Sequence, residues 1–451
     1  MTTWQALVGD SEVDPRLAAA LHDAANPRLT RRVAQLEEGG ADVSFDDEMA
    51  LAWDVIEEVL EAWRADAYTG GRPRLLEATE QALAHAVHHQ IYGLGPIQPF
   101  VEDPQVTDIS VNGCDTTWLT LRDGRKIAGP PAAESDDRLV EIVQRQARRV
   151  GRAERRWDRE SVSLDLQLPD GSRLHALREV TGRPVVHIRR HNWDIAHLSQ
   201  LISDDEVDCA IADFLATAVR ARFNIVVSGG RAAGKTTLLR CLINEIPPSE
   251  RIVTIEDSLE LGIHRFADLH PDVISIEARE PNNEGKGAYT LAQGVRDSLR
   301  MGSGSDGRVM VGEVRGYEVL PMLKVMSQGK DGSMCTVHAN NARNALQRFQ
   351  VYALELDSPL PFEASAPLIA EAVDFVVHLA WDRGPRRRRV ASIVEVSHAE
   401  GGVVHTNEVW KPDAVGRGLP GARLRDETAD RLAEAGFDFE VLDKPHGWWH
   451  T

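Results

Sequence analysis

A glycine-rich segment carries the residue types needed to bind phosphate groups. Residues Gly229 to Thr236 read GGRAAGKT, which fits the pattern GxxxxGK[ST]. The apolar run Phe223 to Val227 precedes this loop, and Thr237 to Ile243 predicts a helix after it, as the pattern requires. Glycines let backbone N–H groups close around phosphate oxygens, and the helix N-terminus adds the positive end of its dipole. The sequence therefore predicts a nucleotide-phosphate site rather than an ordinary strand-to-helix turn.

The side chains of this loop indicate how ATP and Mg²⁺ would be held. Lys235 is predicted to bring a full positive charge to the β- and γ-phosphates, and Thr236 to ligate the Mg²⁺ ion. The predicted nucleotide contacts include every residue of the loop, namely Gly229, Gly230, Arg231, Ala232, Ala233, Gly234, Lys235, Thr236 and Thr237. A second glycine-rich stretch, with Gly302, Gly304 and Gly307, precedes a strand instead of following one, so we interpret it as a loop and not as a dinucleotide site.

Acidic side chains follow two of the predicted strands. ATP hydrolysis needs a metal, a positioned water and a base or orienting group, so carboxylates are expected at strand ends beside the loop. The strand Arg308 to Val311 leads into Glu313, which we predict to be the catalytic carboxylate. The strand Ile252 to Ile255 leads into Glu256, Asp257 and Glu260. For Asp257 and Glu260 the alternative is that they cap the following helix.

The surrounding pattern predicts the elements that position these residues. From about residue 205 apolar strands alternate with helices, which indicates a mostly parallel sheet covered by helices. Upstream, the short apolar runs 109–111, 164–168 and 185–188 are divided by Asn-Gly and Asp-Gly turns, which predicts a small α+β domain. Residues 47–64 have the apolar spacing of an amphipathic helix. The predicted segments are 1–75, acidic and helical; 76–195, α+β; 196–400, the α/β phosphate-loop domain; and 401–451, a C-terminal extension.

Composition narrows the class of partner. Lys and Arg total 51 against 70 Asp and Glu, a formal net charge of -19, so the surface as a whole repels nucleic acid, which makes nucleic acid an unlikely partner. The four cysteines form no CxxC pair, so their spacing supports neither a cysteine-ligated zinc site nor a disulfide framework, and we predict a reducing, cytoplasmic compartment. No apolar run has the ~18 to 20 residues of a bilayer span, and we predict no direct membrane span.

Four motifs in order resemble those of the type II/type IV secretion ATPase superfamily. They are GGRAAGKTT, TIEDSLEL at 254–261, VMVGEVRG at 309–316 and GKDGSMCTVHANN at 329–341, which match the Walker A motif, Asp box, Walker B motif and His box. Residues 92–113 and 168–180 further resemble the CpaF class of Tad pilus assembly ATPases. The resemblance implies a RecA-like P-loop domain behind a small α+β domain. It also implies a homo-hexamer that converts ATP turnover into domain rotation against an inner-membrane platform protein, at the cytoplasmic face of the membrane.

The resemblance also assigns expected roles to individual residues. The catalytic glutamate of the family falls on Glu313, the Asp-box carboxylates fall on Glu256 and Glu260, and the His-box histidine falls on His338. By spacing alone, a histidine at a strand end such as His338 is more often structural than catalytic. Three arginines match family arginines that reach nucleotide phosphate, and the alternative for each is a surface salt bridge: Arg173, Arg189 and Arg279.

Departures from the family pattern leave other functions open. The usual GHxG of the His box reads Gly329-Lys330-Asp331-Gly332 here, and the loop before the Walker B strand is glycine-rich. One alternative function is a nucleic-acid-translocating conjugation ATPase, and another is a nucleotide-gated scaffold with little turnover. We predict that the pair His85 and His89 is not a metal site, because no third ligand is evident. The basic run Arg386 to Arg389 is predicted to be a solvated hairpin tip.

Overall fold

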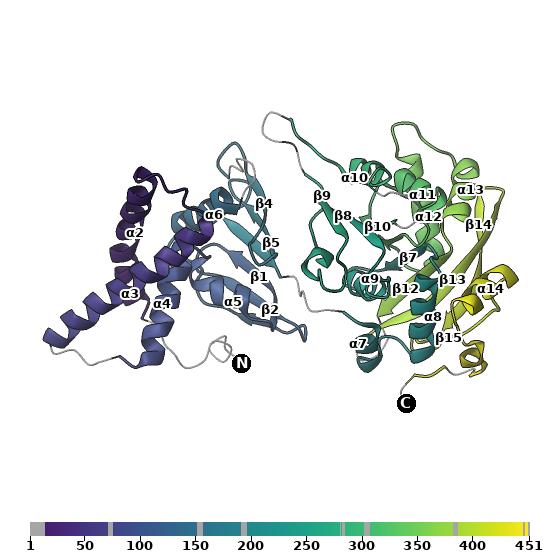
Figure 1. Cartoon of the computed structure of the whole chain (residues 1–451), viewed down its shortest axis with the longest axis horizontal. Coiled ribbons are helices and arrows are strands. Elements are labelled where there is room, and N and C mark those ends of the chain that lie inside the picture. Colours follow the sequence, from purple (N-terminus) through teal and green to yellow (C-terminus); the bar gives the residue numbers. More distant parts are fainter. Residues whose placement is uncertain are drawn as a thin grey trace. The chain divides into compact units, whose positions relative to one another are not determined.

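The computed structural model describes residues 14–70, 75–150, 157–190, 196–279, 281, 285–301, 307–381, 387–444 and 447–449. These residues divide into two compact units, within Met1–Asn192 and Trp193–Thr451 (Figure 1). The first unit therefore contains both the predicted segment 1–75 and nearly all of the predicted segment 76–195. Among the residues described, no helix combines the length and the apolar character needed to cross a membrane.

In the described part of the first unit, three helices come first: α2 (Pro15–Glu38), α3 (Phe45–Thr69) and α4 (Glu77–Ile91). Helix α3 contains the predicted amphipathic helix, and the apolar positions Ala52, Val55, Ile56, Val59 and Leu60 are all buried. They pack with Leu21 of α2 and Leu83 of α4 in one apolar cluster. The three- and four-residue spacing therefore predicted the buried face correctly, because side chains at this spacing lie on one side of a helix.

A six-stranded antiparallel sheet forms the rest of the first unit. Its order is β3-β2-β1-β6-β5-β4. The strands are β1 (Val106–Asn112), β2 (Thr117–Leu121), β3 (Lys126–Ala128), β4 (Ser163–Gln167), β5 (Arg173–Leu177) and β6 (Val185–Arg189). The short helices η1 (Gly95–Ile97) and α5 (Gln98–Glu102) precede them, and α6 (Asp136–Val150) lies between β3 and β4. Alternation along each strand buries one face against the apolar cluster of this unit and leaves a polar face.

The second unit contains a nine-stranded sheet between two helical layers (Figure 1). Its order is β15-β14-β13-β12-β7-β11-β10-β8-β9, and the strands from β12 to β9 are parallel. These are β7 (Ile225–Gly229), β8 (Arg251–Glu256), β9 (Val273–Glu277), β10 (Gly307–Val314), β11 (Met334–His338) and β12 (Phe375–Trp381). The prediction of a mostly parallel, helix-covered sheet is confirmed. Gly307 begins β10, whereas Gly302 and Gly304 lie outside the described residues.

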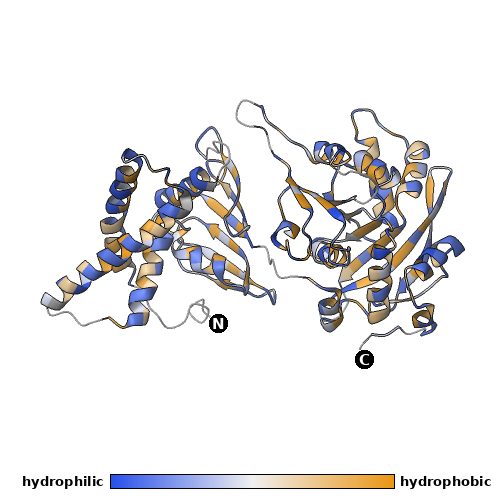
Figure 2. Ribbon diagram, in the orientation of Figure 1, coloured by the Kyte–Doolittle hydropathy of each residue, from blue (hydrophilic) through white to orange (hydrophobic). Residues whose placement is uncertain are grey.

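The helices cover both faces of this sheet because its central strands are apolar on both sides. In β7, Ile225 and Val227 pack into one cluster and Val226 into the other. Figure 2 shows strands of this sheet in the orange of hydrophobic residues. The first layer includes α7 (Leu198–Ser203), α8 (Cys209–Arg220) and α9 (Lys235–Ile243). The second includes α10 (Leu291–Ser298), α11 (Val319–Ser327), α12 (Ala342–Leu354) and α13 (Phe362–Ala372). The single-turn helix η2 (Ile263–Arg265) follows β8.

The chain beyond residue 400 continues the same sheet. Strands β13 (Arg388–Glu400), β14 (Val403–Pro412) and β15 (Gly418–Pro420) add an antiparallel edge, followed by α14 (Asp426–Glu434) and η3 (Phe439–Asp443). Trp410 of β14 is fully buried against Phe214 of α8, with ring centroids 4.5 Å apart. The predicted boundary at residue 400 therefore falls at the turn of a β-hairpin, because β14 pairs with β13 and buries Val409 and Trp410 in the core of the second unit.

A buried ion pair joins the beginnings of two site-bearing strands. Arg308 in β10 is fully buried and donates two hydrogen bonds of 2.7 Å to the carboxylate of Glu250, just before β8. A third bond, from Nη1 of Arg308 to the carbonyl oxygen of Val219, is 2.6 Å long. The planar guanidinium thereby fixes β10 against β8 and α8.

Glu250→Ala is expected to lower the free energy of unfolding of the second unit by about 3–5 kcal/mol, because Arg308 would stay buried without its carboxylate partner. Asp272→Ala is the matched control, since the pair Arg251–Asp272 is exposed and such pairs contribute about 1 kcal/mol or less. Urea unfolding followed by tryptophan fluorescence measures both variants. Equal losses in the two variants would contradict the structural role assigned to Arg308.

Candidate active site

Four neighbouring parallel strands bring the predicted motifs to one edge of the sheet. The strands β7, β11, β10 and β8 lie side by side in that order. Their carboxyl ends carry Gly229, His338, Glu313 and Glu256. His338 is the register partner of Gly229, so the histidine of the His box lies beside the phosphate loop. Carboxyl ends of parallel strands are where α/β proteins place ligands, and here they gather residues far apart in the sequence.

The phosphate loop connects β7 directly to α9. Gly229 is the last residue of β7, and Lys235 is the first residue of α9. A side chain at Gly229 would place its Cβ 2.7 Å from the carbonyl oxygen of Leu379, so only glycine fits against the neighbouring strand. Gly234 has φ 92°, a left-handed conformation that turns the chain into the helix. No side chain caps the N-terminus of α9, so its N–H groups remain available for an anion.

A chain of charged and polar contacts links the lysine of this loop to the predicted catalytic carboxylate. Nζ of Lys235 lies 3.1 Å from Nδ1 of His338 and donates to the carbonyl oxygen of Gly230 at 3.0 Å. Nε2 of His338 lies 2.8 Å from Oε1 of Glu313. An ammonium group only donates, so Nδ1 accepts and the imidazole proton is on Nε2. Oε1 of Glu313 lies close to this nitrogen, but within the described residues the contact does not have hydrogen-bond geometry.

The environment favours a neutral imidazole in this chain of contacts. Burial lowers the pKa of His338, the carboxylate of Glu313 acts in the opposite direction, and the charge of Lys235 lowers the pKa further. Burial also lowers the pKa of Lys235, opposed chiefly by Glu313. His338 therefore serves as a polar bridge between a cation and an anion.

Arg315 completes the cluster on the other side of Glu313. Its Nη2 lies 2.6 Å from Oε2 of Glu313, and its Nη1 lies 2.6 Å from Oδ2 of Asp257. Glu318 holds the backbone here, because its Oε1 accepts the N–H of Gly316 at 3.0 Å and that of Arg315. Arg315 is not among the predicted site residues; it follows the last residue of β10 and lies two residues after Glu313, which is the only signal in the sequence for its place beside that carboxylate.

Glu256 is buried and supports the loop that follows β8. Its Oε1 accepts the N–H groups of Glu260 at 3.0 Å and of Leu261 at 2.8 Å, whereas Oε2 has no partner within the described part of the chain. Burial raises the pKa of Glu256 to about 8, against the two backbone hydrogen bonds. Gly312 leaves the room for it, because a Cβ there would lie 2.9 Å from Cγ of Glu256. Glu260, half-buried on this loop, contributes its charge to the surroundings of Lys235.

The remaining predicted loop residues lie along the loop and the first turn of α9. Arg231 and Ala232 are exposed, and Thr236 and Thr237 are half-buried beside Lys235. The hydroxyl of Thr236 and the carboxylates at the neighbouring strand ends supply oxygen ligands, which suit Mg²⁺. The donor set of this edge therefore fits the ion that the sequence predicts.

Of the three predicted phosphate arginines, two belong to the first unit and one to the second. Arg173 on β5 and Arg189 on β6 are register partners on the polar face of the first unit. Nη2 of Arg173 lies 3.6 Å from Oδ1 of Asp165. In the second unit, Arg279 is exposed, pairs with Tyr289 in a β-bridge and donates from Nε to the carbonyl oxygen of Gly287 at 2.6 Å.

The basic run before β13 differs from its prediction. Arg389 is buried and its Nη2 lies 2.5 Å from Oδ2 of Asp205, so the prediction of a solvated run was wrong at this position. Arg388 lies against the phosphate loop, because a Cβ on Gly234 would be 3.3 Å from its Cδ. The antiparallel pairing of β13 with β12 carries these residues to the edge where β7 ends, which local sequence does not reveal. Arg386 lies outside the described residues.

The sequence predicts that the pair His85 and His89 on helix α4 is not a metal site. The ring centroids of His85 and His89 are 6.1 Å apart, and among the described residues neither belongs to a group of three metal-ligating side chains.

Lys330, in the position where the family has its first His-box histidine, is buried, and its Nζ lies 3.2 Å from the Cβ position of Gly307. Lys330 thus lies at the beginning of β10, at the end of this strand opposite Glu313.

Comparison with known proteins bears directly on this geometry. Residues 90–408 match the model of the family described as type II/IV secretion system protein. A putative conjugal transfer protein of Mycobacterium tuberculosis is 34% identical over 72% of this chain and 90% of its own length. The type IV secretion system protein VirB11 of Brucella suis is 28% identical over 64% of this chain and 84% of its own length. The solved VirB11 ATPase from Brucella suis, in complex with sulphate, is 24% identical, covers 66% of this chain and 95% of its own, and has a TM-score of 0.35. The chain therefore belongs to the type II/IV secretion system protein family and is a secretion-type ATPase.

Proposed function

We propose that the chain is one subunit of a homo-hexameric motor that hydrolyses ATP to drive pilus assembly or protein secretion. The observation that supports this proposal best is the continuous contact from Lys235 through His338 to Glu313. It links the residue that faces the β- and γ-phosphates to the carboxylate that orients the attacking water. A protein that only bound nucleotide would not need a carboxylate linked in this way to the lysine of the phosphate loop.

Each residue of the cluster has a distinct task in this proposal. Lys235 neutralises charge on the phosphates, and Glu313 orients a water and accepts its proton. Mg²⁺, held by Thr236, would neutralise charge on the β- and γ-phosphate oxygens. Arg315 orients the side chain of Glu313, since its guanidinium contacts the carboxylate at 2.6 Å. Glu256 shapes the loop that carries Glu260, and Glu260 adds a second carboxylate beside Lys235.

The partners and location follow from the family resemblance. We place the hexamer at the cytoplasmic face of the inner membrane, bound to a membrane platform protein, with Tad-type pilus assembly as the closest match for residues 92–113 and 168–180. In this arrangement Arg173 and Arg189 reach the γ-phosphate when the first unit closes over the nucleotide, and Arg279 assists from the second unit. ATP then favours the closed state because it has a contact that ADP lacks.

A conjugation motor that moves nucleic acid is the second candidate, because a relative with 34% identity is named a putative conjugal transfer protein. The net charge of -19 disfavours direct contact with a phosphate backbone. Measuring ATP hydrolysis with and without single- and double-stranded DNA at low salt separates the two functions. Stimulation by DNA would favour the conjugation motor.

Glu313→Gln is expected to slow ATP hydrolysis by about two to four powers of ten while ATP binding is retained, because the amide does not accept the proton of the attacking water. Phosphate release and the binding of a fluorescent ATP analogue measure the two properties. Glu355→Gln, at the exposed C-terminus of α12, is the control and should hydrolyse ATP at the parental rate. Parental hydrolysis by Glu313→Gln would transfer the catalytic role to Glu256 or Glu260.

The double change Arg173→Ala, Arg189→Ala is expected to weaken ATP binding more than ADP binding, because only ATP offers the γ-phosphate. Titration with both nucleotides measures the two affinities, and paired fluorescent labels on the two units measure closure. Lys126→Ala, an exposed cation on β3 of the same sheet, serves as the control. If ATP and ADP lose the same affinity, these arginines do not contact the γ-phosphate.

Glu256→Gln is expected to stabilise the protein increasingly as pH rises. Burial raises the pKa of Glu256 from its ordinary 4.5 to about 8, so the native state favours the protonated form. The parent therefore loses stability between about pH 4.5 and 8, whereas glutamine stays neutral. The gain of the variant at pH 8.5 relative to pH 5 should reach at least about 1.4 kcal/mol, the value of a single pKa unit. Urea unfolding at both pH values tests this, and an unchanged difference would show that Glu256 is ionised at little cost.

A further inference from the structure

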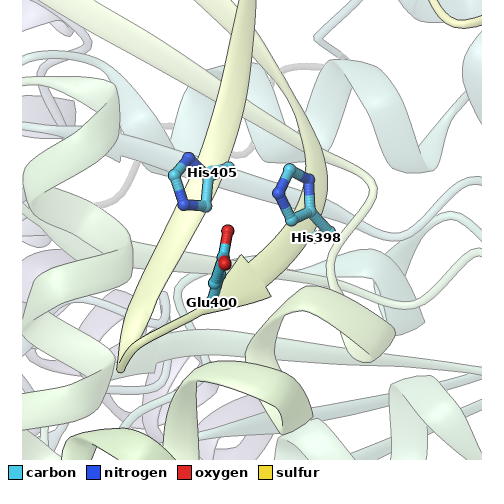
Figure 3. Close-up of side chains that lie close together, drawn as sticks. All are labelled: His398, Glu400 and His405. Atoms are coloured by element: carbon cyan, nitrogen blue, oxygen red, sulfur yellow. The ribbon is translucent and has the colours of Figure 1, made fainter.

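The hairpin formed by β13 and β14 carries three metal-ligating side chains on one face. Figure 3 shows His398, Glu400 and His405 close together, with the carboxylate of Glu400 directed between the two imidazoles. One ligand atom from each residue lies within 4.8 Å of the other two. All three side chains are exposed, so an ion in solution has direct access.

Strand geometry explains why these three residues meet. His398 and His405 are register partners across the hairpin, and their rings stack with centroids 4.5 Å apart and an interplanar angle of 9°. Glu400 follows His398 by two residues and therefore lies on the same face of the strand. The register shifts between Val396 and His398, which indicates a β-bulge around Ser397. A bulge changes the direction of the neighbouring side chains and here contributes to the pairing of the two histidines.

The bulged serine also orients one of the ligands. Oγ of Ser397 donates its proton to the carbonyl oxygen of His405 at 3.1 Å, so it accepts from Nδ1 of His398, also at 3.1 Å. That contact fixes the proton on Nδ1 and leaves Nε2 of His398 with a free lone pair. An outer partner that fixes the tautomer of a histidine ligand is a general feature of metal sites.

Contacts at the turn and on the face opposite the histidines hold the hairpin backbone in place, which reduces the entropy lost when the three ligands are ordered. Gly401 and Gly402 form the turn with φ 56° and 79°. The carbonyl oxygen of Gly402 accepts a hydrogen bond of 2.9 Å from Nε2 of Gln350 in α12. Val404, on the opposite face from the histidines, packs on the core of the second unit. The three ligands therefore project from a supported backbone.

We propose that His398, Glu400 and His405 form a binding site for a divalent transition metal ion, with Zn²⁺ as its best-fitting occupant. Two imidazoles and one carboxylate suit Zn²⁺, whereas Mg²⁺ and Ca²⁺ prefer all-oxygen ligands. Tetrahedral Zn²⁺ separates its ligand atoms by roughly 3.3 Å, given bond lengths of about 2.0–2.2 Å. The observed upper limit of 4.8 Å is larger than that value, so side-chain rotation closes the site around the ion. Three protein ligands leave a fourth position for water or for a ligand from a partner.

This site is separate from the nucleotide site. Strand β13 begins with Arg388 near the phosphate loop and runs antiparallel to β12, and its Glu395 pairs with Phe375, the first residue of β12. His398 and Glu400 lie beyond Glu395, past the amino end of β12 and therefore toward the opposite end of the sheet from the strand ends that carry Glu313 and His338. A metal here would join β13 to β14 without contacting the residues assigned to ATP.

The test is a Zn²⁺ titration of the chelator-treated full chain, followed by calorimetry, with the double variant His398→Gln, His405→Gln beside the parent. The double variant is expected to bind one equivalent fewer, and Glu400→Gln to bind that equivalent at least about tenfold more weakly. His264→Gln, an exposed histidine of η2, is the control and should bind as the parent does. Far-ultraviolet circular dichroism without metal confirms that the variants are folded.

Hydrogen exchange locates the bound ion and distinguishes this site from other histidine-rich surfaces. In the parent, Zn²⁺ should slow the exchange of backbone amides in residues 398–405, and the double variant should lose this protection. Equal Zn²⁺ stoichiometry and affinity in parent and double variant would overturn the proposal. Zn²⁺ binding without protection of this hairpin would overturn it as well.

Discussion

The parallel pairing of β7, β11, β10 and β8 is the constraint on which the rest of the second unit depends. It brings the phosphate loop, His338, Glu313 and Glu256 to adjacent positions at one edge of the sheet. Each strand is apolar enough to be buried on both faces, so the helices on either side are required for the sheet to exist. The polar residues follow directly where the apolar runs end. The geometry of the candidate site is therefore a consequence of core packing.

Cationic and anionic side chains of the site lie in contact and offset part of one another's cost of burial. Glu313 is contacted by His338 on one oxygen and by Arg315 on the other, while Lys235 contacts the far nitrogen of the same histidine. Burial disfavours the charged form of both Lys235 and His338. The carboxylates of Glu313 and Glu260 compensate for part of this cost. A nucleotide entering the loop brings new negative charge next to Lys235 and so alters the balance along the whole chain of contacts.

Glycines in this site act by leaving room or by turning the backbone. Gly229 admits the neighbouring strand, Gly312 admits the buried carboxyl group of Glu256, and Gly234 turns the loop into α9. The antiparallel edge made by β13 to β15 has a different role. It buries Trp410 in the core and carries Arg388 to the loop and the histidine pair to the other end of the sheet. The edge formed by β13 to β15 thus contributes side chains at both ends of the sheet.

The phosphate loop, the strand leading to Glu313 and the alternation of strands and helices could all be predicted from the sequence, because each depends on residues close together in the chain. The order of the four motifs was enough to predict the family. Three contacts become visible only in the folded chain. His338 joins Lys235 to Glu313. Glu256 is buried beside Gly312, and Arg388 lies against Gly234. These contacts depend on the register between strands that are distant in sequence, and a local pattern contains no information on register. The pairing of His398 with His405 likewise depends on a bulge that only the folded hairpin defines.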